Sequence, residues 1–305
     1  MHVLITGADG FVGRALVRRM LSGIDLAFNR LTLVDQRFGD LPTDPRLVPV
    51  AGNIADRALW TDSLSLPADI VFHLASVPGG LAEREFDLGM AVNLHGTLGL
   101  LDALRAQGRT AKFVFASSVA VYGDPLPDTV DDSTPPRPTL SYGAQKLASE
   151  VMVADFSRRG FIDGCSLRLP GIVARPPAPS GLISAFMSEV MWAAAQQRPV
   201  TLPVGPDAVC WWMSVASAVD ALLHATSLPG QGRVWLPPVL RLSIRELVAA
   251  LADRFGPVDV TYTPDPAVEA RFGQQPPLCA DAARAAGFRD DGSVGGLIDR
   301  ALDQS

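Results

Sequence analysis

The chain has 305 residues, 48% of them hydrophobic and 19% charged, with a formal net charge of −6 at pH 7. This composition predicts a globular protein with one large domain or one domain and a smaller lobe. The acidic balance contains no basic block, which argues against nucleic acid or an anionic membrane surface as the main partner. Because the sequence shows neither a leader at Met1 nor an apolar run of membrane-spanning length, we expect a cytoplasmic protein.

The cysteines and histidines predict no metal site. Cys165, Cys210 and Cys279 are odd in number and far apart, which favours free buried thiols over disulfides or metal ligands. The four histidines lack the spacing of a ligand set and occur at His2, His73, His95 and His224. We therefore expect no bound metal.

The chain begins with a strand, a glycine-rich turn and a helix. Residues 2–6 are a short apolar run, residues 7–13 read GADGFVG, and residues 15–21 have a helical pattern. Glycines at these positions allow close approach of the backbone and leave the helix N-terminal amides free to hold a pyrophosphate. The spacing is Gly-x-x-Gly-x-x-Gly rather than the commoner Gly-x-Gly-x-x-Gly.

A second strand, residues 31–34, ends at Asp35, about twenty residues past the last glycine. An acid there can bind both adenosine ribose hydroxyls, whereas the simpler interpretation is a strand-end cap. A carboxylate would also lie against the 2′-phosphate of NADP, with Arg37 as the neighbouring cation. We therefore expect Asp35 to favour NAD over NADP.

Strands and helices continue to alternate, which predicts a doubly wound parallel sheet with ligands outside the carboxyl ends of its strands. The predicted strands are 47–51, 70–75, 113–118 and 164–169, and the predicted helices are 55–64, 87–106 and 142–158. Polar residues at the strand ends are Asn53, the loop 73–76, and Ser117 with Ser118, both of which we expect to face the cofactor crevice. Asn93, inside a helix, should be exposed or bonded to something specific.

Tyr142 and Lys146 lie four residues apart in a predicted helix whose expected N-cap is Ser141. This spacing puts both side chains on one face. A tyrosine with its ordinary pKa of about 10 is a poor base at neutral pH, and a lysine cation beside it favours the phenolate. A bare Tyr-x-x-x-Lys more often marks only an amphipathic helix, so the assignment depends on the rest of the chain.

The pattern changes after residue 170. Residues 175–181 read as a Pro-rich linker and residues 182–196 as a helix, and no second glycine fingerprint follows. We predict a dinucleotide-binding domain over residues 1–170, rejoined by a strand near 233–236, and a smaller substrate-binding lobe over residues 171–305.

In combination the motifs resemble the extended short-chain dehydrogenase/reductases, in the NAD-dependent epimerase/dehydratase branch. The resemblance covers about the first 170 residues and is carried by Gly7, Gly10, Gly13, Asp35, His73, Leu74, Ala75, Asn93, the segment 117–123, Tyr142 and Lys146. It implies a Rossmann-type α/β fold with NAD as cofactor. It also implies that Ser118 binds the substrate oxygen, that Tyr142 is the acid/base, and that Lys146 lowers the Tyr142 pKa and holds the nicotinamide ribose.

The cofactor contacts expected on this basis are Gly7, Gly10, Phe11, Val12, Gly13, Asp35, Asn53, Ile54, Leu74, Ala75, Asn93, Tyr142, Lys146 and Pro170. Asn53 departs from the family, which more often has Asp there. Its amide can still accept a hydrogen bond from adenine, so we expect cofactor binding to survive.

Within that branch the chain is most similar to the D-erythronate dehydrogenases, which oxidise a small sugar acid with NAD. The segments that carry this likeness are 86–97, 117–121, 157–161, 167–170 and 211–214. It implies a free 2-hydroxy acid, with four carbons as the best match, bound by Ser118 and Tyr142. Because Ser76 and Arg175 follow the fourth and sixth predicted strands, we expect both to bind the substrate as well. Arg175 would clamp the carboxylate, its alternative being a solvated linker arginine. Trp211 or Met213 would line the pocket or lie in the core.

Two other functions stay open. A nucleotide-sugar epimerase or dehydratase would use the same Ser118, Tyr142 and Lys146 but return the hydride. Such enzymes usually carry an Arg-Asp-Phe stretch where residues 209–212 here read VCWW, which favours a substrate without a nucleotide. An NAD-sensing binding protein without catalysis would not need the three residues intact.

The branch commonly forms homodimers through the two helices near residues 87–106 and 142–158, an isologous contact. The apolar residues that favour such a contact are Leu98, Leu101, Leu104, Val151 and Val153. We therefore expect a homodimer, the alternative being that loops cover these helices.

Overall fold

The computed structural model describes residues 1–177 and 182–303, which divide into two compact units. Unit 1 comprises Met1–Val121, Pro138–Arg168 and Val219–Trp235, and unit 2 comprises Tyr122–Arg137, Leu169–Ala218 and Leu236–Ser305. Each unit has its own hydrophobic core. The chain therefore passes between the units several times instead of completing one before starting the other.

Unit 1 is built on a seven-stranded parallel sheet with the order β11-β7-β5-β4-β1-β2-β3. Its strands are β1 (His2–Thr6), β2 (Arg30–Asp35), β3 (Leu47–Ala51), β4 (Ile70–His73), β5 (Ala111–Ser118), β7 (Ile162–Leu169) and β11 (Arg233–Trp235). Every residue of β1 and β4 is buried, which explains why these strands are continuous apolar runs in the sequence. The strand order reverses at β1, where doubly wound sheets bind their ligands. The predicted fold class is confirmed.

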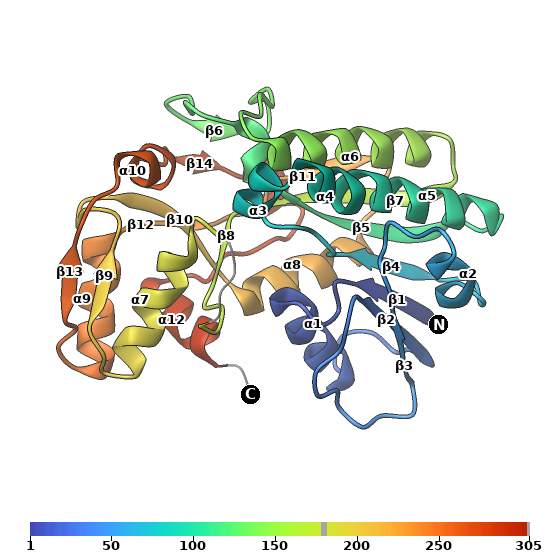
Figure 1. Cartoon of the computed structure of the whole chain (residues 1–305), viewed down its shortest axis with the longest axis horizontal. Coiled ribbons are helices and arrows are strands. Elements are labelled where there is room, and N and C mark those ends of the chain that lie inside the picture. The colour runs from blue at the N-terminus through green and yellow to red at the C-terminus, as the bar shows by residue number, and fades with distance from the viewer. Residues whose placement is uncertain (178–181, 304–305) are drawn as a thin grey trace. The chain divides into compact units, whose positions relative to one another are not determined.

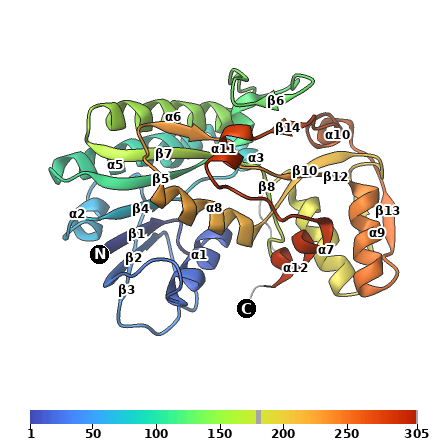
Figure 2. The same cartoon turned by 180° about the vertical axis from the view of Figure 1, so that it is seen from behind.

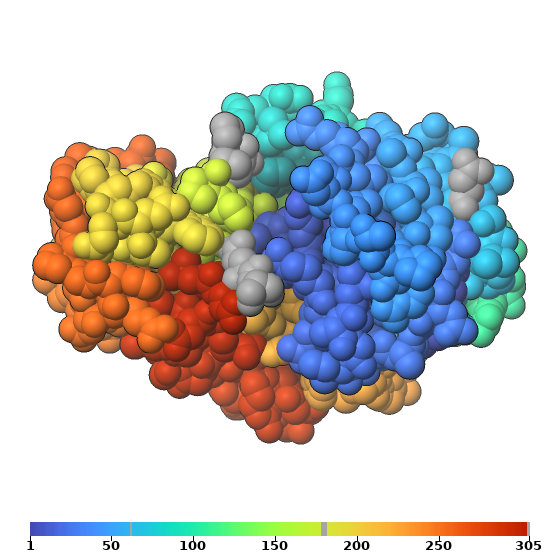
Figure 3. Space-filling model, turned by 90° about the horizontal axis from the view of Figure 1, so that it is seen from below, coloured from blue at the N-terminus to red at the C-terminus, as the bar shows by residue number. Residues whose placement is uncertain are grey.

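Helices cover both faces of this sheet. In Figures 1 and 2, α4, α5 and α6 lie along one face, and α1 and α8 lie along the other. The helical elements are α1 (Phe11–Leu21), α2 (Leu59–Ser63), α3 (Gly79–Arg84), α4 (Phe86–Gly89), the π-helix η1 (Met90–Gly96), α5 (Thr97–Ala106), the 3₁₀ helix η2 (Val119–Tyr122), α6 (Ser141–Arg158) and α8 (Val215–Ser227). In the space-filling view of Figure 3, the N-terminal strands and helices of this unit form the surface drawn in blue.

Three local predictions for unit 1 need correction. The helix predicted over 55–64 begins only at Leu59, because the side chains of Asn53 and Asp56 accept hydrogen bonds from the backbone N–H groups two residues ahead and hold this segment in turns. The helix predicted over 87–106 contains seven π-helical residues. Ser141 is the first residue of α6 and not its N-cap. Its backbone N–H donates instead to the carboxylate of Glu83, at 2.9 Å.

Unit 2 combines short strands with helices. The strands form three small sheets from β6 (Val130–Asp131), β8 (Gly171–Val173), β9 (Val200–Leu202), β10 (Val209–Ser214), β12 (Leu240–Ser243), β13 (Val260–Tyr262) and β14 (Leu278–Cys279). The helices are α7 (Ala185–Ala195), α9 (Ile244–Phe255), α10 (Pro266–Phe272), α11 (Asp281–Ala285) and α12 (Val294–Leu302). The predicted linker at 175–181 lies partly outside the described residues.

The three cysteines differ in their exposure to solvent. All three cysteines are free thiols; Cys165 and Cys210 are buried, but Cys279 is exposed, contrary to the prediction. Burial raises the pKa of the Cys165 and Cys210 thiols to about 12, so both are protonated at neutral pH.

Within residues 1–177 and 182–303, none of the helices has the length and apolar character needed to cross a membrane.

Candidate active site

The turn between β1 and α1 has no space for side chains at Gly7 and Gly13. Gly7 has a φ of 69°, and a Cβ on it would lie 2.7 Å from the backbone nitrogen of Ala75. A Cβ on Gly13 would overlap the carbonyl oxygen of Gly7. The backbone of the turn is therefore packed against the β4 loop, with the first amides of α1 beside it. This arrangement fits the pyrophosphate of a dinucleotide at Gly7, Gly10, Phe11, Val12 and Gly13.

Asp35 ends β2 beside this turn. Its carboxylate accepts hydrogen bonds from the backbone N–H groups of Asp9, at 2.9 Å, and Gln36, at 2.8 Å. Burial raises the pKa of Asp35, while these two N–H groups act in the opposite direction. An ionised carboxylate has about four acceptor positions, so two bonds leave capacity for a pair of ribose hydroxyls.

Asn53 and Ile54 follow β3. The side-chain carbonyl of the exposed Asn53 accepts from the N–H of Ala55 at 3.0 Å. Ile54 is buried and packs against the π-helix at Gly96, where a Cβ would lie 2.7 Å from Ile54 Cγ1. The apolar side chain is thus fixed in place, and the Asn53 amide is already engaged in a turn.

A buried polar chain runs beneath the β1 and β4 strand ends. His73 Nδ1 lies 2.6 Å from the Thr6 hydroxyl, and His73 Nε2 lies 2.8 Å from the Thr97 hydroxyl. Burial, followed by the charge of Lys146, lowers the pKa of His73 to about 3, so the ring is neutral. The Thr6 hydroxyl also accepts from the N–H groups of Leu74 and Ala75, both at 3.2 Å. His73 thereby orders the loop that packs against Gly7.

Asn93 lies inside the π-helix. Of the two predicted alternatives, exposure to solvent or bonds to specific partners, the structure shows the second. Its side-chain oxygen accepts from Val77 N–H at 2.7 Å and from the Ser76 hydroxyl at 3.1 Å. Its Nδ2 donates to Val77 O at 3.1 Å and to Gln145 Oε1 at 2.7 Å. Gln145 lies on α6, between Tyr142 and Lys146 in sequence. Through its bonds to Val77 and Gln145, Asn93 therefore links the loop after β4 to α6.

Lys146 is buried, with 2% of its surface exposed, and its Nζ donates to the carbonyl oxygen of Ala116 at 2.7 Å. The same Nζ lies 5.7 Å from the centre of the Tyr142 ring and 4.7 Å from that of Phe115. Burial lowers the pKa of Lys146 to about 7, and the negative charge of Glu150 opposes this change. The alternative interpretation of the Tyr-x-x-x-Lys pattern, an amphipathic helix, required a lysine that extends into solvent. Lys146 does not do so. It lies at the Tyr142 ring.

The two serines at the end of β5 have different environments, and one prediction was wrong. Successive strand residues point to opposite faces. Ser117 is buried and donates to Glu150 Oε1 at 2.5 Å, so it does not face the crevice. The half-buried Ser118 accepts from the N–H of Ala120 at 3.1 Å, which leaves its hydroxyl proton available to donate. For Ser118, a position facing the cofactor stays a prediction.

The remaining predicted residues belong to unit 2. Trp211 and Met213 are each 1% exposed, and Trp211 Nε1 donates to Pro276 O at 2.7 Å, which is the predicted core alternative. Arg175 is half-buried, and its backbone is held at both ends by Ser188 and Trp192. Pro170 follows β7 directly and is half-buried.

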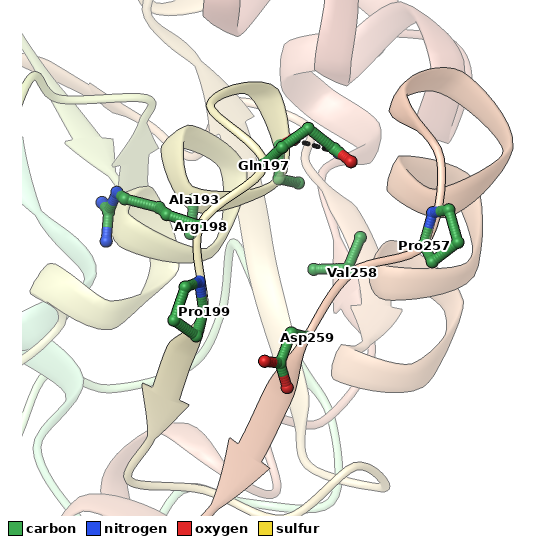
Figure 4. Close-up of a pocket in the computed structure, with 8 residues that line it drawn as sticks. Ala193, Gln197, Arg198, Pro199, Pro257, Val258 and Asp259 are labelled. Atoms are coloured by element: carbon green, nitrogen blue, oxygen red, sulfur yellow. Dashed lines mark hydrogen bonds between the residues drawn. The ribbon is translucent and has the colours of Figure 1, made fainter.

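A separate pocket lies wholly in unit 2, between the end of α7 and the segment that leads into β13 (Figure 4). It is lined by Ala193, Ala194, Gln197, Arg198, Pro199, Pro257, Val258 and Asp259. The Gln197 amide donates to Ala194 O at 2.9 Å, so this polar group is already satisfied. None of the predicted site residues is among these, and we assign the pocket no role. In the described ranges, moreover, His, Cys, Asp and Glu do not form a group that could hold a metal ion.

The family model that matches the chain is the NAD dependent epimerase/dehydratase family, over residues 3–235. The chain belongs to this family. The matched range contains the glycine turn, Asp35, Ser118, Tyr142 and Lys146. The protein is an NAD-dependent oxidoreductase of the extended short-chain type.

Two curated relatives and a solved structure support the family assignment. D-erythronate dehydrogenase from Cupriavidus necator is 37% identical, with 98% of this chain and 97% of that protein covered. D-erythronate dehydrogenase from Haemophilus influenzae is 34% identical, with 75% of this chain and 73% of that protein covered. A solved nucleoside-diphosphate-sugar epimerase from Agrobacterium tumefaciens has a TM-score of 0.90 at 31% identity, with 98% of this chain and 92% of that chain covered.

Sequence reasoning missed Gln145, Glu150 and Arg168, which hold the predicted residues in place. The α6 helix buries Gln145, Lys146, Ser149 and Glu150, and its buried face is therefore largely polar. The signal was present, since Tyr142, Lys146 and Glu150 recur every four residues. A face with that composition needs partners in the interior, and this indicates a functional or networked helix.

Proposed function

We propose that the protein oxidises a secondary hydroxyl of a small sugar acid, a D-erythronate-like 2-hydroxy acid. The observation that carries the proposal is the buried Lys146 ammonium beside the Tyr142 ring. The likeness to two D-erythronate dehydrogenases, one of them along almost the whole chain, supports the substrate class.

Each residue of the motif has a role in this proposal. Tyr142 takes the proton from the substrate hydroxyl, because the Lys146 cation favours its phenolate. Ser118 donates its hydroxyl proton to the substrate oxygen and fixes its orientation. NAD, when bound, supplies the hydride acceptor. The glycine turn would hold its pyrophosphate, Asp35 its adenosine ribose, and Lys146 its nicotinamide ribose; Ile54, Leu74, Ala75 and Pro170 would pack against it.

The acid group of the substrate needs a cation or several N–H donors. We assign this role to Arg175, because a guanidinium binds a carboxylate through two parallel hydrogen bonds. Ser76 would bind a further substrate hydroxyl. The Ser76 hydroxyl donates to the side-chain oxygen of Asn93 at 3.1 Å, so the Ser76 oxygen can accept a hydrogen bond from the substrate. In this proposal unit 2 supplies the substrate selectivity and unit 1 the chemistry.

A nucleotide-sugar epimerase is the second candidate function. The 31% identical solved structure is described as a nucleoside-diphosphate-sugar epimerase, and that observation favours it. Residues 209–212 count against it, because they form the buried strand β10. They read VCWW, without an arginine for a nucleotide phosphate, and Trp211 and Trp212 are interior side chains.

A substrate panel tests the proposal. The protein is incubated with NAD⁺ and either free aldonic acids of three to six carbons or UDP- and dTDP-sugars, and NADH is followed by absorbance. We expect NADH from a four-carbon acid. Turnover of a nucleotide sugar without net NADH would instead establish the epimerase.

We further propose that the protein is a homodimer through the helices of the α4–α6 layer. Phe86 and Val151 support this, since they are 56% and 60% exposed apolar side chains on α4 and α6. Leu101, Leu104 and Val153 do not, because they are fully buried in the core. Sedimentation at micromolar concentration should give twice the 32.3 kDa chain mass. The double variant Phe86→Ser with Val151→Ser should sediment as a monomer.

A further inference from the structure

The buried face of α6 carries a third functional-type residue, one turn beyond Lys146. Glu150 continues the four-residue spacing of Tyr142 and Lys146, so the three side chains share one face of the helix. Only 3% of the Glu150 surface is exposed. An ionised carboxylate at this depth is costly unless its charge is compensated and its oxygens accept hydrogen bonds.

Two neighbouring strands supply those partners. Arg168, on β7, donates from Nε to Glu150 Oε1 at 3.1 Å and from Nη2 to Oε2 at 2.8 Å. Ser117, on β5, donates its hydroxyl to Oε1 at 2.5 Å. Both partners are themselves buried. The carboxylate thus joins α6 to β5 and β7 through a bidentate ion pair and one hydroxyl.

These bonds fix how α6 lies against the end of β5. Ala116 and Ser117 are consecutive on the strand, and they bond Lys146 and Glu150, which are one turn apart on the helix. The next strand residue is Ser118, and the preceding helical turn carries Tyr142. Two bonds between consecutive positions of two rigid elements prevent sliding between them. We infer that this register sets how Ser118 and Tyr142 lie relative to each other.

The charge of Glu150 acts on Lys146 as well. Among the described residues, the charged and titratable groups around Lys146 include Glu150, the Arg168 that pairs with it, Tyr142 and His73, whose ring is neutral. Among these, Glu150 is the negative charge that opposes the effect of burial on the lysine. Lys146 favours the Tyr142 phenolate only while it keeps its proton.

We propose that Glu150 is a positioning residue: held by Arg168 and Ser117, it fixes the register of α6 against the end of β5 and keeps Lys146 a cation. This inference rests on the proposed function, because Glu150 acts through Lys146 and Tyr142. It assigns Glu150 a role that a purely structural ion pair would not have.

The substitution Glu150→Gln removes the charge and keeps the shape. Lys146 then loses its proton at lower pH, and the phenolate of Tyr142 forms at higher pH. We expect the acidic limb of the kcat/KM profile to move up by about one pH unit, the size expected for loss of a nearby opposite charge. An ultraviolet titration of phenolate in the protein without cofactor, with Tyr142→Phe subtracted, should show the same change. Glu150→Asp should restore most of the original profile.

The positioning part has its own test. Ser117→Ala removes one bond to Glu150 without changing any charge, so kcat should fall several-fold while the acidic limb stays in place. Asp291→Asn is the matched control. Asp291 is also a buried carboxylate that accepts from serines, Ser214 and Ser217, and pairs with an arginine, Arg300, but it does so in unit 2. It should lower stability and leave the pH profile unchanged.

Several results would overturn the inference. It fails if the phenolate titration of Glu150→Gln matches that of the unchanged protein, or if Asp291→Asn moves the profile equally. If Glu150→Gln does not fold, it is combined with Arg168→Met. The double variant removes both charges of the ion pair and leaves no lone buried charge. We expect the same pH change from it. The phenolate titration needs no substrate. A protein that turns over no sugar acid yet shows the expected titration therefore refutes the proposed function and not this inference.

Discussion

Lys146 in unit 1 and Arg175 in unit 2 are both cations to which the sequence assigned a function, but the structure holds them differently. The Lys146 side chain is buried, and its Nζ is fixed by the Ala116 carbonyl. At Arg175 the hydrogen bonds that hold the segment involve the backbone, with Ser188 on one side and Trp192 on the other. The Lys146 ammonium is thus fixed at the end of a buried side chain by a backbone carbonyl, whereas at Arg175 Ser188 and Trp192 fix the course of the backbone.

The reason lies in the partners of each residue. In unit 1, buried polar side chains far apart in sequence bond one another, such as Asn93 with Gln145 and His73 with Thr6. A change at one position therefore disturbs several others. In unit 2 the motif segment at residues 211–214 lies in the hydrophobic interior, and it supports the fold. Chemistry should thus be sensitive to isosteric changes in unit 1, and substrate choice to changes at single positions in unit 2.

The largest effect is expected for Tyr142→Phe. This change deletes the proton acceptor and little volume, so kcat should fall by about 10²–10⁴-fold, the usual contribution of a general base. NAD affinity, measured by calorimetry, should change little. A variant that keeps a large share of the original rate would remove Tyr142 from the mechanism and break the contrast between the units.

Arg175→Ala should have an intermediate effect. Loss of a carboxylate clamp should raise KM for hydroxy acids about tenfold, which corresponds to about 1.4 kcal/mol of binding free energy. NAD affinity should be nearly unchanged. Arg198→Ala, another unit 2 arginine, is the control and should leave KM alone. An unaltered KM in Arg175→Ala would mean that the acid is bound elsewhere.

A smaller effect is expected for Asp35→Ala, which should narrow the preference for NAD over NADP severalfold. The 2′-phosphate would no longer meet this carboxylate, although Asp9 remains beside it and pairs with Arg14 at 2.7 Å. The measurement is the ratio of the two dissociation constants. Equal affinity for both cofactors in the unchanged protein would show that Arg37 already compensates Asp35.

The smallest effect concerns stability. Lys146 has a pKa of about 7 in the folded protein against an ordinary 10.5. Between these pH values the unfolded chain binds more protons, so the cost of burying this charge is full below pH 7 and declines toward pH 10. Lys146→Met without cofactor should therefore raise Tm by a few degrees at pH 6, and less at pH 9. Turnover should be lost.

Lys112→Met is the matched control for that stability measurement. Lys112 is also a largely covered lysine, but its Nζ pairs with Asp163 at 2.9 Å. Removing it leaves that carboxylate unpaired, so Tm should fall instead of rising. A fall in Tm for Lys146→Met as well would show that the Ala116 bond outweighs the cost of burial.

The sequence predicted the fold, the glycine turn and the Tyr142–Lys146 helix because each leaves a local signature in periodicity or residue type. It failed at Ser117. Strand alternation places Ser117 and Ser118 on opposite faces, but which of the two is buried depends on Glu150, which is 33 residues away. The π-helix around Asn93 was missed because its residues have ordinary helical periodicity. The capping of α6 by Glu83 could not be predicted either, because it comes from α3. Long-range polar pairing, absent from any local pattern, accounts for the errors at Ser117 and Ser141.

The most direct test of the account is the fate of the hydrogen on the reacting carbon. A four-carbon 2-hydroxy acid deuterated at the oxidised carbon is incubated with the protein and NAD⁺, and the products are analysed by mass spectrometry. Net oxidation predicts one deuterium in the reduced cofactor for each keto acid formed, and no such transfer with Tyr142→Phe. Deuterium retained in a re-formed hydroxyl compound, with no reduced cofactor accumulating, would contradict a dehydrogenase and establish an epimerase.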